Sequence, residues 1–129
     1  KKIFPGRVET LFKFEPLISQ LLLAGDNLPH LVALFTIQPS VAETLPGAAA
    51  PFHECPAVIA EVDRIVRRIN KQLAPFEQIK RFRILPRDFS IEHGEVTATM
   101  KVRRRQVMEN FRPELEDLYR RGASGRGGE

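Results

Sequence analysis

Two short apolar runs constrain the fold of this chain more than any other feature. The runs Ile18–Ala24 and Leu31–Ile37 are almost continuously apolar, and residues 25–29 between them are Gly-Asp-Asn-Leu-Pro, which tolerate or impose turn geometry. This pattern predicts a β-hairpin. Because neither run alternates cleanly between apolar and polar side chains, helices should cover both faces of the two strands. The sequence therefore predicts an α+β fold.

The clearest helical pattern covers residues 56–73. Its apolar side chains recur at the spacing of one helical face: Val58, Val62, Ile65, Val66, Ile69 and Leu73. Residues 78–85 then place basic and apolar side chains on opposite faces, which is typical of a strand. We expect this strand to join the hairpin, so the predicted fold is a small three-stranded sheet flanked by helices on both faces.

Shorter elements surround this framework. Residues 5–14 mix apolar and charged side chains in a pattern that predicts a short helix. Residues 46–56 contain three prolines and three consecutive alanines, which is a loop composition. Residues 90–97 place apolar side chains around His93-Gly94, which predicts a small, exposed hairpin.

The last part of the chain has a second helical pattern, which starts at Lys101. Pro113 should kink or restart this helix near Arg112, because proline removes a backbone donor and clashes with the preceding turn. Residues 122–129 are rich in glycine and should form a flexible tail. We therefore expect residues 1–121 to form the domain.

The composition suits one globular domain without a membrane span. The chain has 129 residues, of which 43% are hydrophobic and 28% charged, and its formal net charge is +4. Its apolar runs stop well short of the roughly 18 residues that a membrane span needs. Cys55 is the only cysteine, which excludes a disulfide framework and favours a reducing, cytoplasmic setting. The chain begins at Lys1 without an initiator Met, which we interpret as the start of a fragment.

Other polar clusters do not have the spacing that chemistry requires. His53, Glu54 and Cys55 are adjacent candidate ligands, but neighbouring residues rarely point at one ion, so we predict no metal site. His30 and His93 stand in turns, where a solvated imidazole needs no function. The glycine-rich tail lacks the flanking strand and helix of a phosphate loop, so we expect no complete nucleotide site.

The densest positive charge lies at residues 101–105, which are Lys-Val-Arg-Arg-Arg. Such a run is most often a solvated helix face, with phosphate or nucleic-acid contact as the alternatives. Residues 94–100 before it predict an exposed turn and a short strand, which would deliver Lys101 at the start of a helix. A cation presented in this way can reach into a cleft of another domain.

Residues 94–104 are Gly-Glu-Val-Thr-Ala-Thr-Met-Lys-Val-Arg-Arg. This segment resembles the Gly-Glu-Leu-Thr-Pro-Thr-Leu-Lys-Val-Arg-Arg motif in the C-terminal domain of AMP-forming long-chain fatty-acid CoA ligases, which belong to the adenylate-forming superfamily. Residues 77–82 look like that family's Glu-Gln-Ile-Lys-x-Phe strand, and residues 25–34 look like its hairpin. The opening Lys-Lys-Ile-Phe-Pro, with Glu9, resembles the segment that follows the family's interdomain hinge. The resemblance covers the chain up to Arg121.

This resemblance implies an enzyme that uses ATP and Mg²⁺ to convert a fatty acid to an acyl-adenylate, and then transfers the acyl group to coenzyme A. It implies that Lys101 is the catalytic lysine. An ammonium between a carboxylate and the α-phosphate would lower their repulsion, align them and stabilise developing charge. The resemblance also implies that Gly94, Thr97 and Thr99 support the loop that carries Lys101. A short hairpin carrying this loop completes the predicted fold.

The resemblance further implies contacts and partners. Four basic residues are candidates for contact with phosphate or coenzyme A, with solvation as the alternative: Lys1, Lys2, Arg103 and Arg104. The family's small domain rotates between the two half-reactions, so Lys101 would swing away in the second. The expected partner is the chain's own N-terminal adenylation domain, which would hold most of the ATP and Mg²⁺ contacts. We expect a cytoplasmic location and leave peripheral membrane association of the full-length enzyme open.

The sequence departs from the family motif at two positions. Ala98 stands where proline is usual, which loosens the loop backbone, and Lys2 replaces a common asparagine. Met100 matches the motif's leucine, whereas many short-chain and aromatic-acid members have glycine there. This residue favours the long-chain group.

Two alternatives remain open at this stage. Acyl-chain selection would lie outside these residues, so an adenylating ligase for another carboxylic acid or another thiol carrier is the nearest alternative. The second is a basic nucleic-acid-binding module, whose contacts would be Arg64, Arg67, Arg68, Arg81, Arg83 and residues 103–105. Acidic residues interleave these arginines and no exposed aromatic platform is evident, so we expect no nucleic acid.

Overall fold

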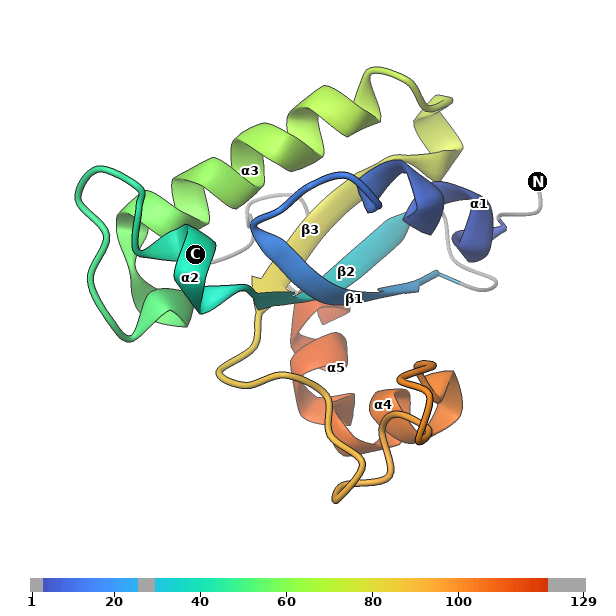
Figure 1. Cartoon of the computed structure of the whole chain (residues 1–129). Coiled ribbons are helices and arrows are strands. Elements are labelled where there is room, and N and C mark those ends of the chain that lie inside the picture. The colour runs from blue at the N-terminus through green and yellow to red at the C-terminus, as the bar shows by residue number, and fades with distance from the viewer. Residues whose placement is uncertain (1–3, 26–29, 121–129) are drawn as a thin grey trace.

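The computed structural model describes residues 4–25 and 30–120, which are built around a three-stranded sheet (Figure 1). Strand β1 (Ile18–Ala24) runs antiparallel to β2 (Leu31–Ile37), with Leu21 opposite Phe35. Strand β3 (Ile79–Ile84) runs parallel to β2 on its other side, which gives the order β1-β2-β3. The predicted hairpin strands and third strand are confirmed. The expected turn at residues 26–29 lies outside the described residues.

The central strand β2 is covered on both faces, as its continuous apolar composition predicts. All seven of its residues are buried. Leu31, Ala33, Phe35 and Ile37 face one hydrophobic core, and Val32 and Leu34 face another. This division follows the two-residue period of a strand. Figure 1 shows α3 on one side of the sheet and α4 and α5 on the other.

The first core lies between the sheet and α3 (Pro56–Asn70). The buried face of α3 is formed by the predicted residues Val58, Val62, Ile65, Val66 and Ile69. At the N-terminal end of the chain, α1 (Pro5–Glu9) and a 3₁₀ turn (Thr10–Phe12) close the same core. The ring of Phe35 lies 5.4 Å from that of Phe12 and 5.7 Å from that of Phe82, between centroids.

Helix α3 ends at Asn70, before the predicted Leu73, because its last residue is bound to β3. The Asn70 side chain donates to the Ile79 carbonyl and accepts from the Ile79 N–H, both at 2.9 Å. The Gln78 amide also donates to the carbonyls of Asn70 and Leu73, at 3.2 and 3.3 Å. These bonds satisfy carbonyls that a helix end leaves without partners.

The second core contains α4 (Arg104–Asn110) and α5 (Arg112–Arg120). The two helices are separated at Phe111, which confirms the predicted restart ahead of Pro113. Three side chains from the segment after β3 complete this core: Leu85, Phe89 and Val96.

Three short elements occupy the connections. They are α2 (Pro39–Ala42) and two 3₁₀ turns, Phe52–Glu54 and Pro75–Glu77. No helix within residues 4–25 and 30–120 has the length and apolarity needed to cross a membrane. The glycine-rich tail expected at residues 122–129 lies outside the described residues.

The short hairpin expected to carry the lysine loop is present, but its position differs from the prediction. Residues 90–97 do not form two paired strands; the Gly94 N–H donates to the Ile91 carbonyl, which closes a turn. The antiparallel pairing is instead a single bridge between Val96 and Val102. Val96 is only 2% exposed, because it packs in the second core. The expected exposed hairpin around His93-Gly94 was therefore wrong in position.

Candidate active site

The residues around Lys101 form a tight loop, which we call the lysine loop (residues 97–101). Hydrogen bonds on either side of the Val96–Val102 bridge fix its base. The Thr97 N–H donates to the Lys101 carbonyl at 2.9 Å, and the Arg103 N–H donates to the Glu95 carbonyl at 2.7 Å. The ends of the loop are thus held to each other.

Hydrogen bonds of Thr97 and Thr99 and the left-handed backbone conformation of Met100 shape the loop. The Thr97 hydroxyl accepts from the Lys101 N–H at 3.1 Å and lies 3.1 Å from the Thr99 hydroxyl. The Met100 N–H donates to the Thr97 carbonyl at 2.8 Å, and Met100 has a φ of 67°. Gly94 has a φ of 72° in the preceding turn, a conformation that glycine adopts without steric cost.

Lys101 lies on the exposed surface of this loop. Within residues 4–25 and 30–120, no group forms a hydrogen bond or ion pair with its ammonium. Helix α4 begins at Arg104, so Lys101 precedes the helix rather than starting it. The loop backbone is held while the charge remains available to an anionic group outside this chain.

A buried carboxylate lies directly beneath the base of the loop. The Glu95 side chain is fully buried and accepts from both terminal nitrogens of Arg87, at 2.7 and 2.9 Å. It also accepts from the Asn110 amide at 2.8 Å and the Ser90 N–H at 3.1 Å. Burial would raise the pKa of Glu95, but these hydrogen bonds and the Arg87 charge outweigh it and lower the pKa to about 2.

The Arg87 guanidinium of this ion pair also contacts an aromatic ring. The Arg87 guanidinium lies over the Phe111 ring, 5.3 Å from its centroid. Its hydrogen bonds to Glu95 raise the pKa of Arg87. The ion pair therefore joins the segment after β3 to the junction of α4 and α5.

Of the four candidate phosphate contacts, the structure describes two. Arg103 is exposed, whereas Arg104 is half-buried and donates to the Leu23 carbonyl. Arg104 also lies near Glu9; burial raises the pKa of Glu9, and the Leu23 backbone and the Arg104 charge act in the opposite direction. Arg104 thus connects α4 to β1 and α1. Lys1 and Lys2 lie outside the described residues.

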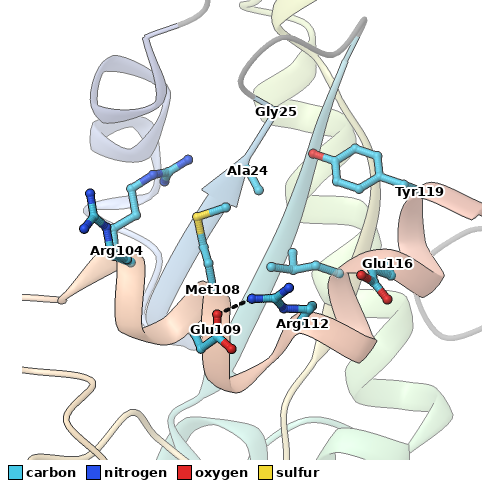
Figure 2. A pocket seen from close by; sticks show the side chains of 10 residues that line it. Ala24, Gly25, Arg104, Met108, Glu109, Arg112, Glu116 and Tyr119 are labelled. Atoms are coloured by element: carbon cyan, nitrogen blue, oxygen red, sulfur yellow. Dashed lines mark hydrogen bonds and ion pairs between the residues drawn. The ribbon is translucent and has the colours of Figure 1, made fainter.

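A groove separates the end of β1 from α4 and α5 (Figure 2). It has a volume of about 590 Å³ and is lined by Ala24, Gly25, Arg104, Arg105, Met108, Glu109, Arg112, Leu115, Glu116 and Tyr119. The Met108 side chain extends toward Ala24, and Glu109 pairs with Arg112 across a helical turn. Lys101 is not in this lining, which contains both arginines and glutamates. The groove does not extend the lysine site.

The candidate metal ligands and histidines do not form a common site. No group of three or more His, Cys, Asp or Glu side chains that could hold a metal occurs in the described part of the chain. His53 pairs with Glu54 at 3.4 Å, and Cys55 is buried. His93 Nδ1 lies 2.6 Å from the Ser90 hydroxyl, and His30 Nε2 lies 3.4 Å from Arg81 Nη1.

Half of the arginines considered for nucleic-acid contact are neutralised or buried. On α3, Arg64 pairs with Glu61 and Arg67 with Asp63, and Arg68 reaches across to Glu15. Arg81 is buried, with 5% of its surface exposed. These arginines do not contribute to one continuous positive face.

Sequence reasoning missed the hydrogen-bonded network of Glu95, Arg87 and Asn110 beneath the loop. Glu95 stands inside the recognised motif, which was the available signal, but nothing local in the sequence shows that its carboxylate is buried. Its partners come from eight residues earlier and fifteen residues later in the chain. Only the folded structure brings the three together.

Comparison with known proteins matches the whole domain. The model of the family described as AMP-binding enzyme C-terminal domain matches residues 1–123. A long-chain-fatty-acid–CoA ligase of Mycobacterium tuberculosis is 37% identical over 127 residues, which cover 92% of this chain and 21% of that protein. Long-chain-fatty-acid–CoA ligase 1 of Homo sapiens is 28% identical over 130 residues, covering 91% of this chain and 18% of that protein. The chain spans about a fifth of the length of these relatives.

Solved structures share the fold. The A-PCP didomain of a carboxylic acid reductase from Segniliparus rugosus, in complex with AMP, has a TM-score of 0.71 and 23% identity, covering 90% of this chain and 16% of that one. The adenylation domain of a carboxylate reductase from Mycobacterium chelonae has a TM-score of 0.72 and 22% identity, covering 88% of this chain and 17% of that one. At this identity, the likeness shows the fold alone.

Proposed function

Because this chain belongs to the AMP-binding enzyme C-terminal domain family, we propose that it is the C-terminal domain of an AMP-forming long-chain fatty-acid CoA ligase. In this proposal Lys101 acts at the adenylation step. The observation that carries the proposal is the exposed, unpaired Lys101 ammonium on a loop whose base is fixed, considered within the described residues. The named relatives, which are long-chain-fatty-acid–CoA ligases, support the substrate class.

Lys101 would act where two anions must meet. In the first half-reaction a carboxylate oxygen of the fatty acid attacks the α-phosphorus of ATP, and the bond from that phosphorus to pyrophosphate breaks. The products are acyl-adenylate and pyrophosphate. The Lys101 ammonium lowers the repulsion between the carboxylate and the phosphate and stabilises the charge that develops between them. A lysine suits this role, since its ammonium is a compact charge on a flexible stem.

The second half-reaction needs no cation at this position. The sulfur of coenzyme A attacks the acyl carbonyl carbon, the bond to the AMP oxygen breaks, and the thiol proton is released. We propose that the domain rotates between the two half-reactions, which carries Lys101 away from the reaction centre. An exposed loop on a separately packed domain is suited to such a movement.

ATP, Mg²⁺ and coenzyme A would be held mainly by the other part of the enzyme. The described residues offer no acidic cluster with the donor set that Mg²⁺ requires, so we derive no step through the metal on this domain. The 129-residue chain alone should bind ATP weakly and catalyse no turnover. Gly94, Thr97 and Thr99 would support the loop, and Arg103 would add positive charge beside it.

The test is Lys101→Ala in the full-length enzyme, with the two half-reactions measured separately. We expect acyl-adenylate formation to fall by two to four orders of magnitude, in line with loss of a group that stabilises transition-state charge. Thioester formation from supplied acyl-adenylate should largely survive. Lys71→Ala is the matched control, because it removes an exposed ammonium at the end of α3, on the other side of the sheet.

Another outcome contradicts the proposal. If both half-reactions of the Lys101→Ala enzyme match those of the Lys71→Ala enzyme, Lys101 is a surface charge and its assignment is wrong. If both half-reactions fall together, the substitution has damaged the fold or docking of the domain, and the result says nothing about the chemistry of Lys101.

A further inference from the structure

The Glu95 carboxylate is fully buried beneath the lysine loop, whereas the side chain of its partner Arg87 is 37% exposed. The Glu95 backbone carbonyl accepts from the Arg103 N–H, so it forms part of the loop's base. The Glu95 side chain turns the other way, into the domain, where Arg87, Asn110 and the Ser90 N–H bind it. One residue thus joins the base of the loop to two other segments of the chain, the connection after β3 and the end of α4.

The pair is not explained by stability alone. Removing the Glu95 carboxylate fully and the Arg87 guanidinium partly from water costs free energy that their attraction often fails to return, and apolar side chains of similar volume frequently serve as well or better. Here both carboxylate oxygens have two partners each, from the segment after β3 and from the end of α4. Bidentate pairing of an arginine with a carboxylate also fixes the relative orientation of the two groups. Such a network fixes the position of the Glu95 side chain.

The outer part of the lysine loop has little packing of its own. Ala98, Thr99, Met100 and Lys101 are all exposed, and so is Val102 on the far side of the bridge. The direction in which Lys101 points is therefore set at the base of the loop. Misplacement of a reacting group by about 1 Å can cost roughly a hundredfold in rate.

We propose that Glu95, held by Arg87 and Asn110, is the positioning residue that orients the lysine loop for adenylation. This inference rests on the proposed role of Lys101. It predicts that loss of the Glu95 charge loosens the loop more than it loosens the sheet. It also predicts that the loss affects the half-reaction that uses Lys101 and spares the other.

The first experiment needs no activity and uses amide hydrogen exchange in the 129-residue chain. The reporters are the N–H groups of Thr97 and Arg103, which close the base of the loop, and the reference is the Leu85 N–H, which donates to the Phe35 carbonyl in the sheet. Glu95→Gln should accelerate exchange at both reporters at least tenfold relative to Leu85. Glu61→Gln, the same change in the Glu61–Arg64 ion pair on α3, should leave the ratio unchanged.

The second experiment uses the full-length enzyme. Glu95→Gln should lower the rate of acyl-adenylate formation at saturating substrate at least thirtyfold, with little change in KM and with thioester formation from supplied acyl-adenylate retained. Arg87→Lys, which keeps the cation but loses the bidentate geometry, should fall between wild type and Arg87→Gln. A role in folding alone would reduce both half-reactions in parallel.

The outcomes separate this inference from the proposed function. Acceleration of exchange at Thr97 and Arg103 that is no greater than at Leu85 would show that Glu95 acts through global stability alone, which overturns the inference. Normal adenylation by the Glu95→Gln enzyme, when Lys101→Ala abolishes it, also overturns the inference but leaves the function intact. If Lys101→Ala leaves adenylation intact, the proposed function fails; the exchange ratio then still decides whether Glu95 fixes the loop.

Discussion

Met100 bears the conformational strain of the lysine loop. It is the only residue other than glycine with a positive φ in the described part of the chain, and its side chain is 57% exposed. A left-handed conformation costs an L-residue roughly 1–2 kcal/mol, and few contacts offset that cost here. The resemblance implied that many short-chain and aromatic-acid ligases have glycine at this position. The backbone angle gives a physical reason for that glycine.

Substitutions at Met100 should therefore follow backbone preference rather than hydrophobicity. A β-branched residue at this φ is a severe misfit, so Met100→Val should open the loop and accelerate tryptic cleavage after Lys101 about tenfold, whereas Met100→Gly should stay within about threefold of wild type. Rates are normalised to the same bond in the urea-unfolded chain. Ala98→Val is the control, because Ala98 has no positive φ. Equal cleavage of the Val and Gly variants would contradict the strain argument.

Among the elements, the strands and α3 were predictable because their apolar periodicity is a local property. The parallel direction of β3 and the early end of α3 were not. The parallel direction of β3 follows because the chain crosses over through α3 between β2 and β3. The end of α3 depends on contacts between Asn70 and Ile79, which form only when α3 lies against the sheet. Residues 90–97 were placed wrongly for the same reason: burial of Val96 in the second core displaces the pairing expected from a local turn signal.

The link between α3 and β3 can be tested at Asn70. Asn70→Ala removes a donor and an acceptor and leaves two Ile79 backbone groups without these partners, so the free energy of unfolding should fall by about 2 kcal/mol. The measurement is the urea unfolding midpoint of the 129-residue chain, at constant slope. Gln72→Ala, at a nearby exposed position, should change the free energy of unfolding by less than about 0.5 kcal/mol. Similar losses for the two variants would show that the Asn70 bonds contribute little.

For the whole molecule, Glu95 makes stability depend on pH. The pKa of Glu95 is about 2 in the folded chain against an ordinary value of 4.5, so the unfolded chain binds this proton more readily. Its contribution, on the order of 3 kcal/mol, is complete above about pH 5 and is lost as the pH falls toward 2. Glu9 acts in the opposite direction, since burial raises its pKa.

Comparison of wild type with Glu95→Gln isolates this contribution, because Glu9 is common to both chains. At pH 7 the variant should unfold at a clearly lower urea concentration. As the pH falls from 5 to 2 the two midpoints should converge, since protonation removes from wild type the charge that the variant already lacks. A gap that stays constant over this range would mean that the Glu95 carboxylate does not titrate with folding.

Much of the candidate site was recognisable from sequence, and the rest depends on the folded molecule. The motif at residues 94–104 identified Lys101 and the two threonines. It did not reveal that Arg104 is half-buried, because its acceptor, the Leu23 carbonyl, lies eighty-one residues away in β1. Buried polar networks join distant segments, so no local sequence pattern predicts them.

The division of the domain into two cores has a consequence for how it can open. The core that supports the lysine loop is built mostly from one contiguous stretch, residues 85–118, whereas the core on the α3 side draws on residues from 8 to 84. A contiguous layer with its own contacts is a natural cooperative unit of sub-global unfolding. In the proposed enzyme, release of α4 and α5 would displace Lys101 while α3 stays on the sheet, so loss of activity on heating should precede loss of the fold.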